Sequence, residues 1–213
     1  MIRLFTLAAL GAAAFVAAAP AVAASDAQAY AACVAKARPR QAAELLNART
    51  AAAASDPYRD LAHNDYCFSR VFTGSYQPQD AAVSIGALRG HFAETALLAD
   101  PRAAALQPLP LQQKRYLRPW FAATGRHPAV DEMAACMADT DPAAIMGLIR
   151  TAPGSWDENS WMGSMPASLT KCLSAGVRLD ASRPALRAAL ADALYQRVHN
   201  PALSLAPAVE TAK

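Results

Sequence analysis

Two short stretches that carry a cysteine at the same position constrain this 213-residue chain most strongly. Residues 30–35 read Tyr-Ala-Ala-Cys-Val-Ala, and residues 133–138 read Met-Ala-Ala-Cys-Met-Ala. After each stretch come a proline suited to a helix start, a second cysteine and a segment opened by Leu-Arg. An order of motifs that recurs along a chain indicates an internal repeat. We therefore predict a duplicated protein, with one helical repeat over residues 25–99 and another over residues 128–200.

Residues 1–24 have the pattern of a secretory signal peptide. Arg3 precedes an uncharged apolar run, and the small residues at 21–24 suit cleavage by a signal peptidase. No later uncharged stretch reaches the roughly 20 residues that a membrane span needs. We therefore expect the mature chain to be periplasmic or secreted and to have no transmembrane span.

The cysteine count and spacing predict two disulfides. An exported chain with an even number of cysteines normally pairs them, because its compartment is oxidising. The pairs Cys33 and Cys67, and Cys136 and Cys172, have nearly the same spacing in the two predicted repeats. We therefore expect one disulfide within each repeat. No Cys-x-x-Cys pair or histidine cluster has the spacing of metal ligands, so we predict neither a metal nor another cofactor.

Composition favours an all-α fold with about four helices in each repeat. Alanine and leucine, which lose little side-chain freedom in helices, predominate, and only 9 residues are glycine. The second helix of each repeat is expected to begin at Pro39 or Pro142. The third helix of the first repeat is expected to begin at Asp56-Pro57 and to run through Cys67. Residues 201–213 lack periodicity and are expected to form a flexible tail.

Residues 100–127, between the repeats, form a basic connector interrupted by prolines. Lys114, Arg115 and Arg118 lie there with Trp120, and the connector has no acidic residue after residue 100. Such a segment suits contact with an anionic surface or an acidic envelope protein. The alternative is a bridging helix whose aromatic side packs between the repeats while its basic side is solvated. The net charge of +3 for the whole chain is too small to indicate nucleic acid.

A second candidate binding segment contains two tryptophans and two methionines. Trp156, Trp161, Met162 and Met165 lie in a stretch that we predict to be a loop. Aromatic and methionine side chains on a loop suit contact with a partner or a small molecule, because they bury much area and adapt in shape. The alternative is a loop that folds back to cover the core of the second repeat.

The segment Pro-Ala-Ser-Leu-Thr-Lys at residues 166–171 resembles the active-site motif of the penicillin-binding D,D-carboxypeptidases. In a Ser-x-x-Lys motif, one helical turn brings the lysine amine beside the serine oxygen. The resemblance implies that Ser168 is a nucleophile and Lys171 its base. The Ser-x-Asn and Lys-Thr-Gly motifs of that family do not follow here, and the equivalent positions in the first repeat are His63 and Tyr66.

These observations lead to one principal expectation and one alternative. The principal expectation is a non-enzymatic binding or interaction protein of the cell envelope. Its binding surface would be the basic connector, the segment with the two tryptophans, or the groove between the repeats. The alternative is a serine acyl-enzyme built on Ser168 and Lys171.

Overall fold

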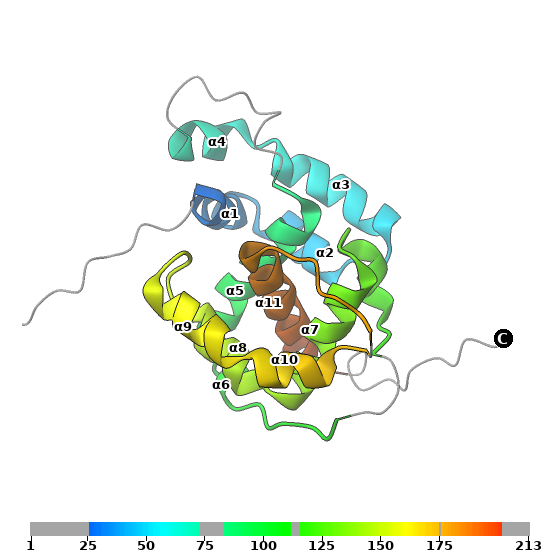
Figure 1. The fold of residues 1–213 in the computed structure, drawn as a ribbon. Helices are drawn as coiled ribbons and strands as arrows, with labels where there is room; N and C mark the ends of the chain where they lie inside the picture. Colours follow the sequence, from blue (N-terminus) through cyan, green and yellow to red (C-terminus); the bar gives the residue numbers. More distant parts are fainter. Residues whose placement is uncertain (1–25, 73–82, 112–115, 175, 202–213) are drawn as a thin grey trace, which may run out of the picture.

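The computed structural model describes residues 26–72, 83–111, 116–174 and 176–201, and the regular secondary structure of this part of the chain consists of helices, without a strand (Figure 1). The all-α prediction is confirmed. The expected signal peptide and flexible tail lie outside the described residues, apart from the first residue of the tail. The α-helices are α1 (Asp26–Ala37), α2 (Pro39–Asn47), α3 (Ala51–Ala62), α4 (Asp65–Val71), α5 (Ile85–Ala99), α6 (Pro101–Ala104), α7 (Pro128–Thr140), α8 (Pro142–Ile149), α9 (Trp156–Ser164), α10 (Pro166–Cys172) and α11 (Arg183–His199), and a 3-10 helix, η2 (Pro119–Ala123), precedes α7.

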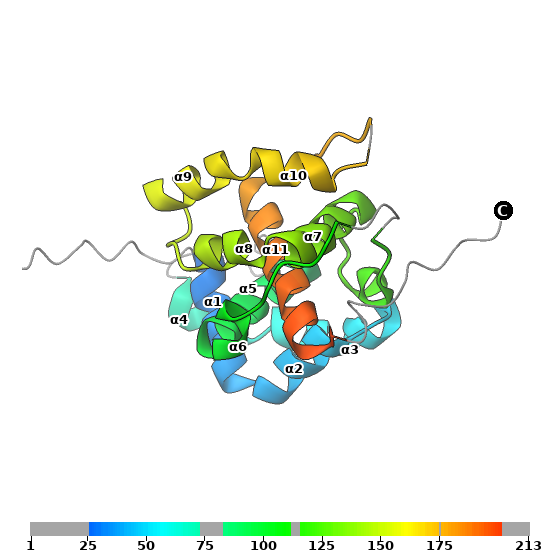
Figure 2. The same cartoon turned by 90° about the horizontal axis from the view of Figure 1, so that it is seen from below.

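Helices α5 and α11 pack against each other at the centre of the fold (Figure 2). Their contact is close at Gly90, where an added Cβ would lie less than 3.0 Å from Ala188. At the C-terminal ends, Nε2 of His199 lies 3.4 Å from Oδ2 of Asp100. The N-terminal ends line one common cavity. The two helices therefore run in the same direction.

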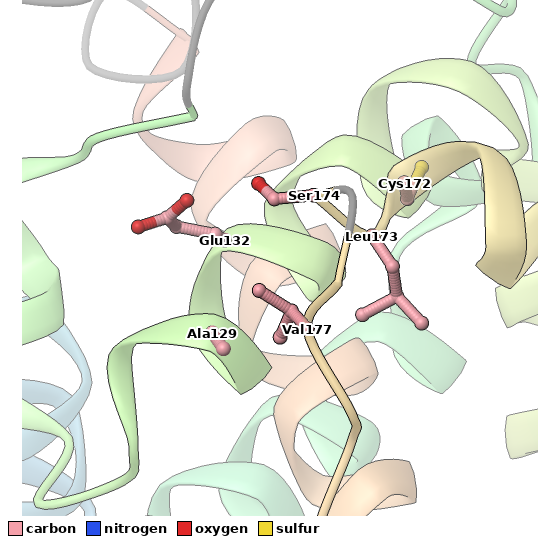
Figure 3. A pocket seen from close by; sticks show the side chains of 6 residues that line it. All are labelled: Ala129, Glu132, Cys172, Leu173, Ser174 and Val177. Carbon is pink, nitrogen blue, oxygen red and sulfur yellow. The ribbon is translucent and has the colours of Figure 1, made fainter.

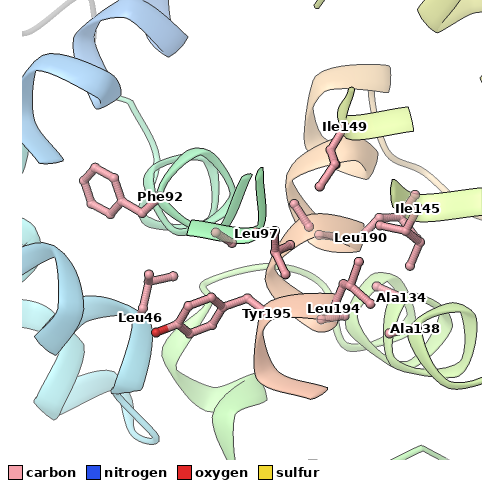
Figure 4. Close-up of a cluster of buried hydrophobic side chains, with 14 of the residues drawn as sticks. Leu46, Phe92, Leu97, Ala134, Ala138, Ile145, Ile149, Leu190, Leu194 and Tyr195 are labelled. Carbon is pink, nitrogen blue, oxygen red and sulfur yellow. The ribbon is translucent and has the colours of Figure 1, made fainter. Parts of the chain in front are cut away.

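The core is built around the side chains of α11 (Figure 4). Leu190 and Leu194 point toward α7 and α8, where Ile145 is fully buried, whereas Tyr195 points toward Leu46 of α2. Burial of each such side chain contributes about 1.5–3 kcal/mol to the free energy of unfolding. A helix with large apolar side chains on several sides is therefore most stable at the centre of the fold.

Although α11 is deeply buried, it is not purely apolar. Arg187, Asp192, Gln196 and Arg197 are buried among its alanines and leucines. Buried charges of this kind require partners, because an unpaired charge in the interior is costly. None of the described helices combines the length and apolar character needed to cross a membrane.

Both predicted disulfides are present. Cys33 pairs with Cys67, which joins α1 to α4, and Cys136 pairs with Cys172, which joins α7 to α10. The Cα–Cα distances are 5.6 and 5.5 Å. Each bridge closes a loop within one predicted repeat, which restricts the unfolded chain and stabilises the fold.

The predicted third helix of the first repeat is wrong in its bounds. α3 begins at Ala51, because the Thr50 hydroxyl accepts the N–H of Ala53 at 3.1 Å, and Pro57 lies inside the helix. A separate helix, α4, then carries Cys67, whose N–H donates to the side chain of Asn64 at 3.0 Å. The first predicted repeat thus has five helices instead of about four.

The predicted loop at 156–165 is also wrong, because residues 156–164 form α9. The Ser155 hydroxyl accepts the N–H of Glu158 at 3.1 Å and begins the helix. Glu158 in turn accepts the N–H of Gly154 at 2.6 Å. Serine followed three residues later by glutamate is a helix-start signal that the abundance of Gly, Ser and Trp in this segment obscured. The second predicted repeat therefore also has five helices.

Candidate functional site

A cavity of about 670 Å³ lies between the N-terminal ends of α5 and α11. This volume is in the range of small-molecule sites. The first turn of α1, the residue Arg126 and the segment that leads into α9 complete its walls. Much of the lining is small and apolar, from Ala27, Ala87, Pro153, Pro184, Ala185 and Ala188.

Both central helices begin at this cavity, and a serine caps each of the two helix starts. The Ser84 hydroxyl accepts the N–H of Ala87 at 3.2 Å, and the Ser182 hydroxyl accepts the N–H of Ala185 at 3.4 Å. Neither α5 nor α11 has an acidic residue in its first turn. The positive ends of two helix dipoles therefore meet at the cavity without a neutralising side chain in those turns.

Arg126 forms one wall of the cavity, and its charge is already compensated. Its Nε lies 2.7 Å from Oδ1 of Asp131, and its Nη2 lies 2.6 Å from Oδ2 of Asp192. The remaining Nη1 donates to the carbonyl of Gly86 at 3.0 Å. Burial raises the pKa of Asp131 despite the attraction of Arg126. This arginine is therefore occupied in joining the connector to both central helices.

Arg187 forms another wall and is also fully engaged. It holds Glu94 with two hydrogen bonds of 2.9 and 3.1 Å and Glu158 with one of 3.0 Å. Its two Nη atoms also donate to the carbonyls of Leu148 and Ile149, each at 3.1 Å. Burial raises the pKa of Glu94, although hydrogen bonding to Arg187 opposes this effect. The cluster ties α5, α8, α9 and α11 together.

Arg89 makes the reciprocal contact from α5 to α11. It binds both carboxylate oxygens of Asp192, at 2.8 and 3.0 Å, and donates to the carbonyls of Leu45 and Leu46. Burial by itself would raise the pKa of Asp192, but the charges of Arg89 and Arg126 hold it below its usual value. A carboxylate between two arginines is therefore maintained in the interior of the protein.

His91 borders the cavity from α5. Burial, helped by the nearby charge of Arg187, lowers the pKa of His91 from 6.5 to about 4. Its Nδ1 atom is buried and has no hydrogen-bond partner among the described residues. The imidazole is thus neutral at pH 7, and a proton added to it would be poorly accommodated.

We expect His91 to make the protein less stable in mild acid. Because its pKa is lower in the folded state, the unfolded chain binds more protons between pH 6.5 and about 4, so stability falls as pH decreases through that range. At pH 5 the loss from this group is on the order of 2 kcal/mol. Chemical denaturation of wild-type and His91→Gln protein at pH 7 and pH 5 measures this loss of stability.

His63 provides the control for this prediction, since it is exposed. The variant His91→Gln should show a smaller loss between the two pH values than wild type, whereas His63→Gln should behave like wild type. An equal loss in wild type and His91→Gln would contradict the assignment of this pH dependence to His91.

Two of the connector residues that were predicted to contact a partner are buried. Arg118 and Trp120 are buried, with 5% and 1% of their surface exposed, and Nη2 of Arg118 lies 3.3 Å from Oδ2 of Asp139. Lys114 and Arg115 lie outside the described residues. The basic connector therefore presents neither Arg118 nor Trp120 to solvent, because long-range packing against α7 draws the arginine inward.

The two tryptophans of α9 differ from each other. Trp156 has 79% of its surface exposed, and Trp161 has 39%. An added Cβ at Gly147 would lie less than 3.0 Å from the Trp161 ring, so this side chain packs over α8. Trp161 thus partly covers the core, whereas Trp156 remains at the surface, two positions after the wall residue Gly154.

Ser168 and Lys171 lie on α10 as the motif requires, but their surroundings differ from those of a serine nucleophile and its base. The Ser168 hydroxyl donates to Oδ2 of Asp141 at 3.0 Å. Lys171 is exposed to solvent. The described hydrogen bond of Ser168 therefore goes to a carboxylate at the start of α8 instead of to the lysine amine.

A smaller cavity, of about 350 Å³, lies beside the Cys136–Cys172 disulfide (Figure 3). Leu173 and Val177 line it together with Glu132, whose carboxylate points away from these two apolar side chains. Among the described residues, no group of three or more His, Cys, Asp or Glu side chains could hold a metal ion. The cavity at the starts of α5 and α11 is the better candidate, because several polar groups converge there.

Comparison of the chain with models of protein families, with curated proteins and with solved structures finds no match. Function is therefore inferred from the cavity itself. The sequence indicated a groove between the predicted repeats but assigned no residues to it. Ser84 and Ser182 were available as cap signals before their helices, yet no local pattern shows that the two helix starts meet.

Proposed function

We propose that this chain is an exported binding protein whose ligand, a small molecule, enters the cavity between the starts of α5 and α11. The observation that carries the proposal is a cavity of about 670 Å³ with mostly small apolar walls and a few convergent polar groups. The charged residues Arg126 and Arg187 in its walls are bound to acidic partners. These two arginines shape the site and supply neither a nucleophile nor a base. His91 also borders the cavity, but its buried Nδ1 has no hydrogen-bond partner among the described residues that would orient the ring as a base. We therefore propose binding and not catalysis.

We further propose that the chain arose by internal duplication and that the cavity lies where the two repeats meet. Reciprocal ion pairs support this proposal, because Arg89 of α5 binds Asp192 of α11 while Arg187 of α11 binds Glu94 of α5. Each arginine also donates to two successive carbonyls of the second helix in its own half. Sites between related units are common positions for small-molecule binding.

The proposed location is the periplasm or the extracellular space. The two disulfides support it, since such bonds persist in oxidising compartments. The signal-peptide pattern of residues 1–24 points the same way.

Filling the cavity tests the binding proposal. Ala87 and Ala185 line it, and a phenylalanine at Ala87 would occupy part of its volume. We expect the neutral dye N-phenyl-1-naphthylamine to bind folded wild-type protein with one saturable site, and Ala87→Phe to weaken binding at least tenfold. Fluorescence titration measures the affinity, and near-ultraviolet circular dichroism verifies that both proteins are folded.

Ala99→Phe is the matched control, because Ala99 is exposed at the far end of the same helix. It should bind the dye as wild type does. Equal dye affinity in wild type and in both Ala87→Phe and Ala185→Phe would show that this cavity is not the binding site.

A further inference from the structure

We infer that the cavity selects amphipathic organic anions, such as carboxylates with an apolar body, and that Arg183 is the residue that binds the anionic group. The inference rests on the proposed function, because it names the ligand class of that same cavity. It follows from which polar groups at the cavity are already engaged and which still have hydrogen-bonding capacity.

The apolar part of the ligand is indicated by the wall. Alanine and proline side chains from α1, α5, α11 and the segment before α9 line much of the cavity. Burying an apolar ligand body against such a wall is favourable, because it removes apolar surface from water. The same wall offers few hydrogen bonds to a strongly polar ligand. A highly polar ligand would therefore leave much of this surface unused.

A cationic group on the ligand is disfavoured because the lining acid is already bound. Glu158 is the acidic residue among the lining side chains. One of its oxygens accepts from Arg187 at 3.0 Å, and the other accepts the N–H of Gly154 at 2.6 Å. Arg126 and Arg187 add positive charge to the wall, although each is balanced by carboxylates behind it.

Arg183 differs from the other two arginines of the lining. It is the first residue of α11 and is exposed, and its described hydrogen bond goes to the neutral side chain of Asn159. A cation at a helix start is unfavourable for the helix dipole, so this position does not serve helix stability. Its planar guanidinium has donors left for the two oxygens of a carboxylate.

The two serine caps are further donors at the cavity, and His91, which also lines it, is neutral at pH 7. Ser84 and Ser182 accept backbone N–H groups through their oxygens, which leaves each hydroxyl proton available. With the positive ends of α5 and α11 directed at the same space, the electrostatic potential there favours an anion. An apolar wall with donors at the helix starts thus matches a monoanion that has one apolar end.

Competition against the bound dye tests this inference with three ligands of one chain length. We expect octanoate to displace N-phenyl-1-naphthylamine from wild-type protein at a concentration at least tenfold lower than 1-octanol or octylamine. Arg183→Gln should reduce this preference for octanoate to less than threefold while the dye still binds. Arg150→Gln, which removes another exposed arginine, should retain the full preference.

The outcomes separate this inference from the proposed function. Dye binding that Ala87→Phe weakens, combined with equal displacement by octanoate and octanol, would overturn the anion preference and leave the cavity as a binding site. A preference for octanoate that persists in Arg183→Gln would overturn the role of Arg183. Dye binding that is unaffected by filling the cavity would overturn the proposed function itself.

Discussion

Replacing Gly90 by alanine should lower the free energy of unfolding by about 3 kcal/mol, although alanine is the better helix former. The reason is the contact between α5 and α11, where an added Cβ would lie less than 3.0 Å from the Cα, Cβ and carbonyl oxygen of Ala188. Two of these atoms belong to the backbone, so the helices themselves must separate to make room. Urea denaturation of wild type and variant at pH 7 measures the difference.

Gly163 provides the control, because it is also helical but an added Cβ there would meet no atom within 4 Å. Gly163→Ala should therefore leave stability unchanged or raise it by up to about 1 kcal/mol. If Gly90→Ala were as stable as wild type, this result would contradict a close backbone contact between α5 and α11 at Gly90.

Replacing Asp192 by asparagine should cost about 3–5 kcal/mol, because it removes one partner of a buried ion cluster. Asp192 is fully buried and lies 2.8 Å from Nε of Arg89 and 2.6 Å from Nη2 of Arg126. The nearly isosteric amide has no charge, so the two arginines would keep their positive charges without this counter-ion. Thermal and urea denaturation of the variant should both show the loss.

Glu44 is the matched control for this substitution. It pairs with Arg40 at 2.9 Å on the surface of α2, where both side chains are exposed, so Glu44→Gln should change stability by less than about 1 kcal/mol. Since the pKa of Asp192 is lowered in the folded state, its contribution is present above the ordinary value of 3.8 and is lost as pH falls through the folded-state pKa. If Asp192→Asn lowered the free energy of unfolding at pH 7 by less than about 1 kcal/mol, the buried ion cluster would not contribute to stability as expected.

Several features of the fold could be predicted because they depend on neighbouring residues or on the spacing of the cysteines. Proline starts marked α2 and α8, and the spacing of the four cysteines indicated the correct pairing. The errors at α3 and α9 were also local. Thr50 caps α3 at an earlier start than the expected one, and Ser155 caps a helix in a segment that was expected to be a loop.

The candidate site could not be predicted in the same way. The sequence left open whether the connector forms a basic and aromatic contact surface or packs its aromatic side between the repeats, and in the structure both Arg118 and Trp120 are buried. The walls of the cavity come from α1, α5, α9 and α11, which are far apart along the chain. A local pattern contains no information on which helix starts meet, because that depends on how whole helices pack.

The sequence alone was therefore sufficient to predict the helical class and the disulfide pairing. Helix propensity and caps depend on a few neighbouring residues, and the pairing followed from the similar spacing of the cysteines in the two predicted repeats. Tertiary structure alone determined the charge pairing and the cavity. Arg89 and Glu94 are five positions apart on α5 and do not pair with each other there. Their partners, Asp192 and Arg187, lie 103 and 93 positions away. Those distances are spanned only because α5 and α11 pack side by side and run in the same direction, which brings the two helix starts together around the cavity.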